Sequence, residues 1–331
     1  MKALVVGGTG ILSSDLVKVL MKNGWDVSVL NRGITPGAGE AETIICDAYD
    51  ETAMAKAMEG RRYDVVVSFT GYLPRQVEGD IRVFSGKCDQ YIFISTCAVY
   101  EKPDAMYLTT ESSPLRNKDS EYGRLKIACE ETLNHAYRDE DFPVTIVRPN
   151  WTYGVTTIPF IATSWCKPWT LLERIKNGKP VLMPGDGTSR FTLTHTLDLA
   201  EGIMGLMGNA GSIGHAFHIT GDEALSWNQY LENIEKAFGY KANVVNVSTQ
   251  FICEVVPQWH DDLFGDKIVT FLFDNSKIKR FVPGFCAKIP FSKGIRMSVE
   301  YVMEHPDRQV IDEEYTAVYD KIFSAYKEKR G

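Results

Sequence analysis

The chain lacks the features that mark several large classes of protein. It has no long basic run, and its 43 acidic and 36 basic residues leave a net charge of −7. This balance does not favour a nucleic-acid or anionic-membrane partner. No segment approaches the roughly 20 apolar residues of a membrane span, and the apolar run at the start is too short for a signal peptide. We therefore expect a cytoplasmic protein without a membrane or nucleic-acid partner.

The chain also lacks the cysteine and histidine patterns of disulfide frameworks and metal sites. Its seven cysteines are scattered, odd in number and without a CxxC pair, and its six histidines show no ligand spacing. Such usage argues against disulfides and zinc and is typical of the reducing cytosol. We expect no bound metal.

The most informative pattern that is present lies at the start of the chain. Residues 3–6 form a short apolar run that ends in the turn GGTG, and apolar residues at helical spacing follow from 16 to 20. This order predicts the strand, tight turn and helix that open a dinucleotide-binding sheet. Gly7 and Gly10 tolerate the turn and let backbone N–H groups approach a pyrophosphate. Ser13 stands where a third glycine is often found.

Apolar strands and helices alternate through the first half of the chain. The pattern predicts further strands at 26–30, 43–46, 64–69, 91–95 and 144–147, and helices at about 50–59, 76–87 and 120–138. This alternation is typical of an α/β, Rossmann-type doubly wound parallel sheet, in which the strand C-terminal ends share the ligand-binding edge. The later part of the chain predicts helices near 169–177, 196–207 and 226–239, a strand at 216–219, and only shorter elements towards the C-terminus.

The pattern also suggests how the chain divides. We expect a dinucleotide-binding domain from residues 1–150 together with roughly 192–222. Residues 151–191 and 223–331 are expected to form a smaller C-terminal substrate lobe.

A tyrosine and a lysine stand four residues apart in the motif YGRLK at 122–126. Residues at this spacing share one face of a helix. An ammonium beside the Tyr122 phenol stabilises the phenolate and lowers its pKa from near 10, and the Lys126 ammonium can also bind ribose hydroxyls. Thr96 follows the fifth strand at the ligand-binding edge, where its hydroxyl can orient a substrate alcohol. The three residues are candidates for general acid–base catalysis. The alternative for the Tyr–Lys pair is a solvated helix face.

These motifs resemble those of the extended short-chain dehydrogenases/reductases, in the NAD-dependent epimerase/dehydratase family. The resemblance rests on GGTGILS at 7–13, FTG at 69–71, ISTCAVY at 94–100, YGRLK at 122–126, VRPNWTYG at 147–154 and DGTSRFTLTHTLDLA at 186–200. It implies that Thr96, Tyr122 and Lys126 are the catalytic set, with Tyr122 as the acid/base. It also implies a C-terminal substrate lobe.

The resemblance further implies where a nicotinamide cofactor is held. It places Asp47 near the adenine, residues 69–71 along the cofactor, and Arg148 and Pro149 beside the nicotinamide. The full set of cofactor contacts that we expect is Gly7, Gly10, Ile11, Leu12, Asn31, Arg32, Asp47, Phe69, Thr70, Gly71, Lys126, Arg148 and Pro149.

The end of the second strand departs from the family pattern for NAD. Members that require NAD often place an acidic residue there to hold the ribose hydroxyls, and this chain has Asn31 and Arg32. A guanidinium suits a 2′-phosphate and can also stack on adenine. We therefore favour NADP(H), with NAD as the alternative if Arg32 only stacks.

Further departures concern the reaction and the substrate. The family's 4,6-dehydratases carry an acidic pair after the catalytic threonine, where this chain has Cys97 and Ala98. Dehydration is therefore disfavoured, and we expect Cys97 to be a small buried residue. Trp151 replaces an asparagine that holds the diphosphate in many nucleotide-sugar enzymes, and Arg190 is left as the candidate phosphate ligand. The expected substrate contacts are Thr96, Trp151 and Arg190.

Four tryptophans in the second half of the chain allow two interpretations. They line an apolar or sugar-stacking cleft, or they belong to the core of the lobe, and we expect core positions for at least two. The four residues are Trp151, Trp165, Trp169 and Trp227.

Together these patterns predict an NAD(P)-dependent epimerase or reductase of a sugar or nucleotide-sugar. The first alternative is an NADP-dependent ketoreductase or dehydrogenase of a non-nucleotide substrate, which Trp151 favours. The second is a non-catalytic, cofactor-binding regulatory or RNA-associated protein. Because relatives commonly pair two helices of each subunit, we expect a homodimer through helices 76–87 and 120–138.

Overall fold

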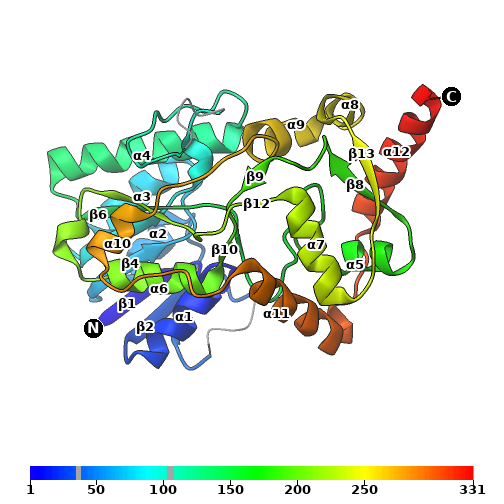
Figure 1. Cartoon of the computed structure of the whole chain (residues 1–331). Coiled ribbons are helices and arrows are strands. Elements are labelled where there is room, and N and C mark those ends of the chain that lie inside the picture. The colour runs from blue at the N-terminus through cyan, green and yellow to red at the C-terminus, as the bar shows by residue number, and fades with distance from the viewer. Residues whose placement is uncertain (35–38, 103–107, 331) are drawn as a thin grey trace.

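A seven-stranded parallel sheet forms the centre of the N-terminal part in the computed structural model, which describes residues 1–34, 39–102 and 108–330 (Figure 1). The strand order is β11-β6-β5-β4-β1-β2-β3, and neighbouring strands pair in parallel. The strands are β1 (Lys2–Val6), β2 (Asp26–Asn31), β3 (Glu42–Ile45), β4 (Tyr63–Ser68), β5 (Cys88–Ile94), β6 (Val144–Pro149) and β11 (Ala216–Ile219). The predicted Rossmann-type sheet is confirmed.

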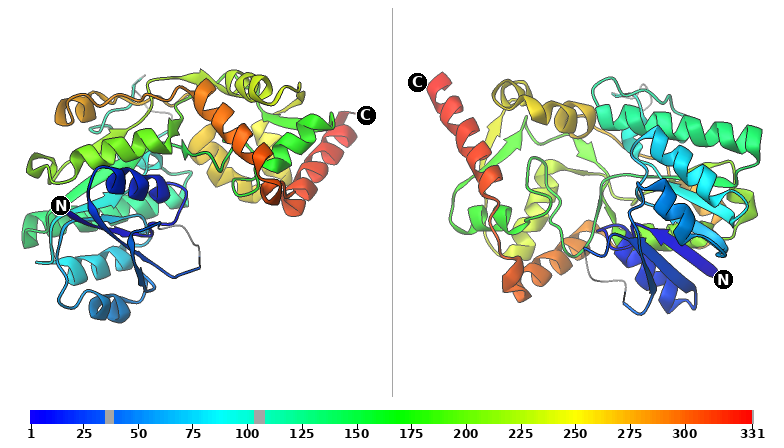
Figure 2. Two further views of the ribbon diagram at one scale, coloured as in Figure 1. Left: turned by 90° about the horizontal axis from the view of Figure 1, so that it is seen from below. Right: turned by 180° about the vertical axis from the view of Figure 1, so that it is seen from behind.

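Helices cover both faces of this sheet (Figure 2, left). On one face α1 (Ser13–Lys22) packs against α6 (Thr196–Leu206), and their apolar side chains form one core with alternate residues of the strands. On the other face α2 (Glu51–Ala57), α3 (Pro74–Phe84) and α4 (Glu121–Glu140) enclose a second core. The edge strand β3 is largely exposed. The central strands are buried on both faces and are therefore mostly apolar without regular alternation.

The C-terminal part builds a third core between helices and a short parallel ladder. Its longer elements are α5 (Trp169–Lys176), β8 (Pro180–Pro184), α7 (Trp227–Phe238), β13 (Asn243–Val247), α8 (Thr249–Val255), α11 (Phe291–Glu304) and α12 (Glu313–Arg330). Cys97, Val99 and Tyr100 also belong to this core, so the lobe packs directly on the end of β5. The proposed domain boundaries stay a prediction.

The remaining elements of the described chain are short. They are η1 (Cys97–Val99), β7 (Thr152–Tyr153), β9 (Arg190–Phe191), β10 (Thr194–His195), η2 (Ala210–Ser212), β12 (Leu225–Ser226), η3 (Pro257–Trp259), α9 (His260–Asp262), the π-helical turn η4 (Leu263–Lys267), α10 (Ser276–Phe281) and η5 (Pro306–Arg308). Two-residue ladders pair β10 with β7 and β12 with β9.

The expectation of only short elements near the C-terminus was wrong. Helix α11 buries Phe291, Ile295 and Val299 at helical spacing, and α12 buries Tyr319 and Ile322 in the lobe core. These spacings are visible in the sequence, but the many charged residues between them conceal the narrow apolar stripe.

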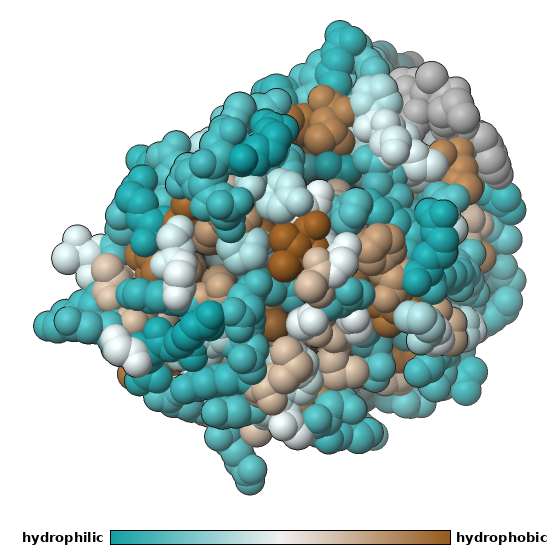
Figure 3. Space-filling view, turned by 90° about the vertical axis from the view of Figure 1, so that its left-hand side faces the viewer, coloured by the Kyte–Doolittle hydropathy of each residue, from teal (hydrophilic) through white to brown (hydrophobic). Residues whose placement is uncertain are grey.

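None of the helices in the described chain combines the length and apolar character needed to cross a bilayer. The end of the molecule opposite α12 is mainly hydrophilic, with small, separated apolar patches (Figure 3).

Helices α3 and α4, which were predicted to pair between two subunits, lie side by side on one face of the sheet. The homodimer stays a prediction.

Candidate active site

The C-terminal ends of β1, β4, β5 and β6 surround a cavity of about 600 Å³. Segments far apart in the chain meet here, as the parallel topology predicts. Of the residues singled out from the sequence, those that line this cavity are Gly7, Gly10, Ile11, Leu12, Phe69, Thr70, Thr96, Tyr122, Lys126, Pro149 and Trp151.

The glycine turn has the geometry expected at a pyrophosphate site. Gly7 has a φ of +80°, and a Cβ on it would lie 2.8 Å from Cγ2 of Thr70. The Ser13 hydroxyl donates to the Gly7 carbonyl at 2.6 Å and accepts from the Gly10 N–H at 2.9 Å, so it fixes the turn from within. No side chain among the described residues caps α1 at Leu12. The Ser14 N–H donates to the Gly10 carbonyl at 3.0 Å, and the positive partial charge at the start of α1 favours an anion beside the turn. These residues fit a dinucleotide.

A smaller cavity of about 140 Å³ continues from the turn and shares Gly7, Tyr49 and Thr70 with the larger one. The residues predicted to hold the adenosine end line it, namely Asn31, Arg32 and Asp47. Tyr49 and, in the larger cavity, Tyr72 were missed from the sequence. Tyr49 lies two positions after the predicted contact Asp47, and Tyr72 directly follows the predicted contact Gly71. This closeness in the sequence could have identified both tyrosines.

Helix α4 carries Tyr122 to the end of β5. Ser120 caps the helix by accepting from the Gly123 N–H at 3.0 Å. Gly123 lets the helix approach η1 closely, because a Cβ there would lie 2.5 Å from the Ala98 carbonyl oxygen. As a result Tyr122 and Thr96 both line the cavity. The candidate acid/base and its neighbour therefore meet in the cavity.

The pKa of Tyr122 is raised in this structure. Desolvation of the hydroxyl at the cavity wall is the largest cause, although the Tyr122 residue as a whole is 40% exposed. The neighbouring Tyr72 adds to the rise, and Thr96 acts in the opposite direction. This direction is opposite to the lowering expected from the Tyr–Lys spacing. A phenol with a raised pKa keeps its proton at neutral pH, which suits the donation of a proton to a carbonyl.

Lys126 explains why the expected lowering does not occur. Its side chain is buried, and its Nζ donates to the carbonyl oxygens of Gly71 at 2.7 Å and Ile94 at 2.9 Å. Burial lowers its pKa to about 8, although the nearby Cys129 and Glu130 act in the opposite direction and raise it. The ammonium thus joins the ends of β4 and β5 at the floor of the cavity. Gly71 contributes this carbonyl, although it does not itself line the cavity.

Arg148 and Arg190 do not face the cavity. Arg148 is buried, forms an ion pair with Glu130 at 2.6 Å and donates to the Tyr100 hydroxyl at 2.7 Å. Arg190 is exposed on β9 and lines none of the cavities described here. The contact of Arg148 with the cofactor and that of Arg190 with the substrate stay predictions. The positions of the two side chains do not favour them.

The expectation for Cys97 is confirmed. It is buried, and its thiol donates to the Arg148 carbonyl at 3.2 Å. Burial raises its pKa well above the usual value, so the thiol is inert.

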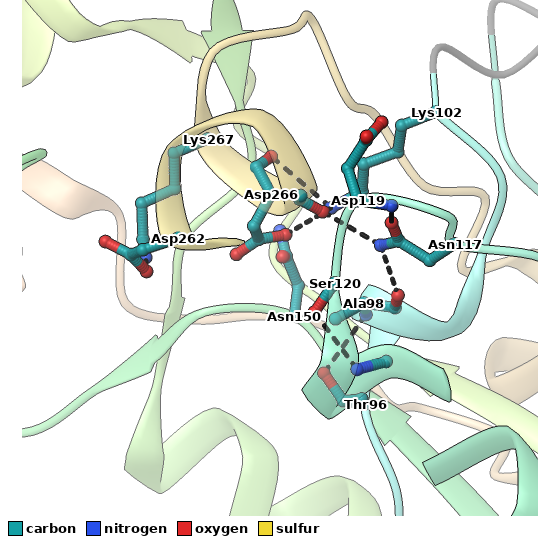
Figure 4. Close-up of polar contacts among 12 residues, drawn as sticks. Thr96, Ala98, Lys102, Asn117, Asp119, Ser120, Asn150, Asp262, Asp266 and Lys267 are labelled. Atoms are coloured by element: carbon teal, nitrogen blue, oxygen red, sulfur yellow. Dashed lines mark hydrogen bonds and ion pairs between the residues drawn. The ribbon is translucent and has the colours of Figure 1, made fainter. Parts of the chain in front are cut away.

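One further segment of the site was not predicted. Residues 261–267, in α9 and η4, line the cavity through Asp261, Asp262, Asp266 and Lys267 (Figure 4). Asp261 accepts from the Ser120 hydroxyl at 2.8 Å and from the Glu121 N–H at 2.6 Å. The only sequence signal was a dense run of charges, HDDLFGDK, which reads equally well as an exposed loop.

This segment is held against the sheet by a set of polar contacts. Lys102 is paired with Asp266 and donates to the Gly265 carbonyl at 2.8 Å, and Asn117 donates to the same carbonyl at 2.9 Å (Figure 4). The Asn117 amide also donates to the Ala98 carbonyl at 2.7 Å. The lobe thereby forms one wall of the cavity beside Tyr122.

Comparison with known proteins agrees with the architecture. The model of the NAD dependent epimerase/dehydratase family matches residues 3–220. The chain is 26% identical over 256 residues to the chloroplast stem-loop binding protein of 41 kDa b of Arabidopsis thaliana, covering 72% of this chain and 64% of that protein. It is 25% identical over 260 residues to 2'-dehydrokanamycin reductase of Streptomyces kanamyceticus, covering 77% and 71%. With UDP-glucose 4-epimerase of Yersinia enterocolitica the identity is 24% over 263 residues, covering 64% and 75%.

Solved structures share the fold at lower identity. Epimerase Mth375 of Methanothermobacter thermautotrophicus superposes with a TM-score of 0.78 at 16% identity, covering 92% of this chain and 93% of that one. The UDP-glucuronic acid 4-epimerase of Bacillus cereus, in complex with NAD, gives a TM-score of 0.74 at 20% identity, covering 92% and 97%.

Proposed function

The chain belongs to the NAD-dependent epimerase/dehydratase family, and from this we propose that it transfers hydride at a carbinol carbon of a sugar-like substrate. The observation that carries the proposal is the meeting of Thr96, Tyr122 and Lys126 in one cavity with the glycine turn. A bound nicotinamide supplies the acceptor or donor of the hydride. The relatives named as a reductase and as an epimerase support this class of reaction.

Each side chain has a distinct part in the proposed reaction. The Tyr122 hydroxyl gives its proton to a substrate carbonyl during reduction and takes one from a substrate hydroxyl during oxidation. Thr96, which lines the same cavity as Tyr122, orients the substrate oxygen. Lys126 holds the strand ends in place and presents its ammonium to the cofactor ribose. The replacement of Tyr122 by phenylalanine, which keeps the ring and removes the hydroxyl, tests this assignment.

The site favours epimerisation or reduction over dehydration. Elimination of water needs an additional acid and base, and the two positions after Thr96 hold the buried Cys97 and Ala98. A ketone that is formed, turned and reduced in place gives an epimer, whereas a ketone that is released or taken up gives a dehydrogenase or reductase.

NADP is the proposed cofactor, with NAD as the alternative. Arg32 lines the small cavity at the adenosine end together with Asp47, and the position that follows Asn31 in the chain holds this arginine instead of an acidic residue. We expect NADP⁺ to bind more tightly than NAD⁺. The variant Arg32→Ala is expected to lose about tenfold in NADP⁺ affinity, as for one charge-assisted hydrogen bond, and little in NAD⁺ affinity. Fluorescence titration with both cofactors measures this, and equal or tighter NAD⁺ binding by the unchanged protein would reject the preference.

The binding of the cofactor is expected to depend on pH through Lys126. Because burial lowers the pKa of Lys126 to about 8, its ammonium loses a proton as the pH rises through that value. A charged donor contributes about 1 kcal/mol more than a neutral one, so affinity is expected to fall about fivefold between pH 7 and 9.5. Isothermal titration across this range measures the fall. In Lys126→Met the profile is expected to be flat, and a fall of the same size in that variant would contradict the assignment.

A second candidate function follows from the name of one relative. The stem-loop binding protein of Arabidopsis thaliana favours the RNA-associated alternative for this chain. Two observations weigh against it, since Tyr122 and Lys126 are both present in the cavity and the net charge is −7. A phosphate backbone is bound through basic surface, which this chain lacks as a continuous run.

A further inference from the structure

A second cavity, of about 250 Å³, adjoins the main one on the side of the lobe. The two cavities share Trp151, Trp165, Asp262 and Lys267. These four residues therefore lie at the boundary between the two cavities, and we call them the threshold residues. The second cavity has no role in the acid–base chemistry at Tyr122. A substrate that reaches Tyr122 and extends into the lobe must pass over the threshold residues.

Two of the threshold residues present aromatic faces. The rings of Trp151 and Trp165 lie 5.6 Å apart between centroids at 36°. Trp151 is fixed from behind by Trp227, at 5.6 Å, and by Phe191, at 6.3 Å. The expectation that at least two tryptophans belong to the core is confirmed, because Trp169 and Trp227 are buried, while Trp151 and Trp165 are partly buried against the same core. Fixed, partly buried indoles can stack on the C–H face of a ring.

The other two threshold residues are an ion pair. The Lys267 ammonium is paired with Asp262 and lies 4.7 Å from the centroid of the Trp151 ring. Lys267 is buried, whereas about half of the Asp262 side chain is exposed. The pair offers acceptors and donors side by side above an aromatic face, and adjacent hydroxyls of a ring can satisfy both kinds of group.

The charges of the cavity do not suit a diphosphate. Among the described residues, the cations that line either cavity are Lys126 and Lys267. Lys126 donates to two carbonyls, and its remaining N–H is assigned to the cofactor ribose, while Lys267 is paired with Asp262. Three carboxylates, of Asp261, Asp262 and Asp266, line the same cavity. Asp262 and Asp266 are themselves paired, with Lys267 and Lys102. A pyrophosphate beside this wall would therefore meet the Asp261 carboxylate and, in the described lining, no uncommitted lysine to receive it.

We propose that the substrate is a saccharide or cyclic polyol without phosphate, stacked on Trp151 and Trp165 and hydrogen-bonded by Asp262 and Lys267. The proposal rests on the proposed function, which places the reacting carbon at Tyr122. The proposed substrate differs from a nucleotide-sugar because its ring carries no diphosphate. The threshold residues then determine specificity, while Thr96 and Tyr122 perform the chemistry.

Saturation-transfer NMR on the protein saturated with NADP⁺ tests the proposal. The probes are D-glucose, D-galactose, D-glucosamine, methyl β-D-glucopyranoside, myo-inositol and sucrose, with UDP for comparison. We expect one or more of the ring compounds to bind in a manner that depends on Trp151 and Lys267. Trp151→Ala and Lys267→Met are each expected to weaken that binding, by about tenfold for the loss of the indole. Trp151→Phe, which preserves a ring, is expected to give a smaller loss.

The control is Trp259→Phe, because Trp259 is half-buried against Tyr315 and lies outside both cavities. Its saccharide binding is expected to equal that of the unchanged protein. Micromolar binding of UDP that is lost in Trp151→Ala, or the absence of any saccharide signal that depends on Trp151, overturns the proposal. The variant Tyr122→Phe separates the two proposals. It is expected to bind saccharide normally, and full turnover by this variant would reject the proposed function without touching the binding result.

Discussion

Replacing Tyr122 by phenylalanine is expected to lower kcat by about 10²–10⁴-fold, the usual contribution of a positioned acid/base, with the cofactor dissociation constant unchanged. The ring of Tyr122 reaches the cavity from the first turn of α4, and its hydroxyl is the proposed proton donor. Removal of the oxygen therefore deletes the proton donor and keeps the packing. Turnover is followed by absorbance of the reduced nicotinamide, with the substrate selected by the binding experiment.

The matched control for this prediction lies on the same helix. Tyr137 is also exposed and also part of α4, but it does not line the cavity. Tyr137→Phe is expected to keep full activity. If Tyr122→Phe also kept full activity, the acid/base assignment would be wrong.

Replacing Arg148 by methionine is expected to lower the free energy of unfolding by about 3–5 kcal/mol, because it leaves a buried carboxylate without its partner. Arg148 and Glu130 are both buried, and the guanidinium bonds both carboxylate oxygens. Ser95 and Tyr100 complete the network. Urea unfolding of the purified variant measures the change.

Two comparisons distinguish this mechanism from a general effect of losing an arginine. Arg82 forms an exposed pair with Glu51, and Arg82→Met is expected to have little effect, as is usual for surface pairs. The double variant Arg148→Met/Glu130→Leu removes both charges and is expected to recover much of the loss. A loss in Arg148→Met no larger than in Arg82→Met would show that the buried pair does not stabilise the fold.

The sequence was sufficient for the sheet and for the centre of the site, for a physical reason. Each buried strand is a continuous apolar run, and the parallel topology brings the residues after these runs to one edge. The glycine turn, Thr96, Tyr122 and Lys126 are all local patterns of this kind. Their meeting at one cavity follows once the strand order is known.

The lobe side of the site could not be predicted in the same way. No spacing relates Asp261 to Ser120, and no periodicity indicates that Lys267 lies over Trp151. These contacts depend on how α9 and η4 pack on the end of the sheet. Arg148 shows a related limit, since its position after β6 does not tell whether the guanidinium enters the cavity or the pair with Glu130.

The contact of Asp261 with the start of α4 has a consequence for how the enzyme can be recombined. The helix that carries Tyr122 receives part of its N-terminal cap from the lobe, since Asp261 bonds both Ser120 and the Glu121 N–H. The two halves are therefore not interchangeable modules. A lobe grafted from a relative would bring a new specificity. If that lobe had no carboxylate at the position of Asp261, the first turn of α4 would fray. Tyr122, which lies in that turn, would then be displaced and the chimera would lose its acid/base.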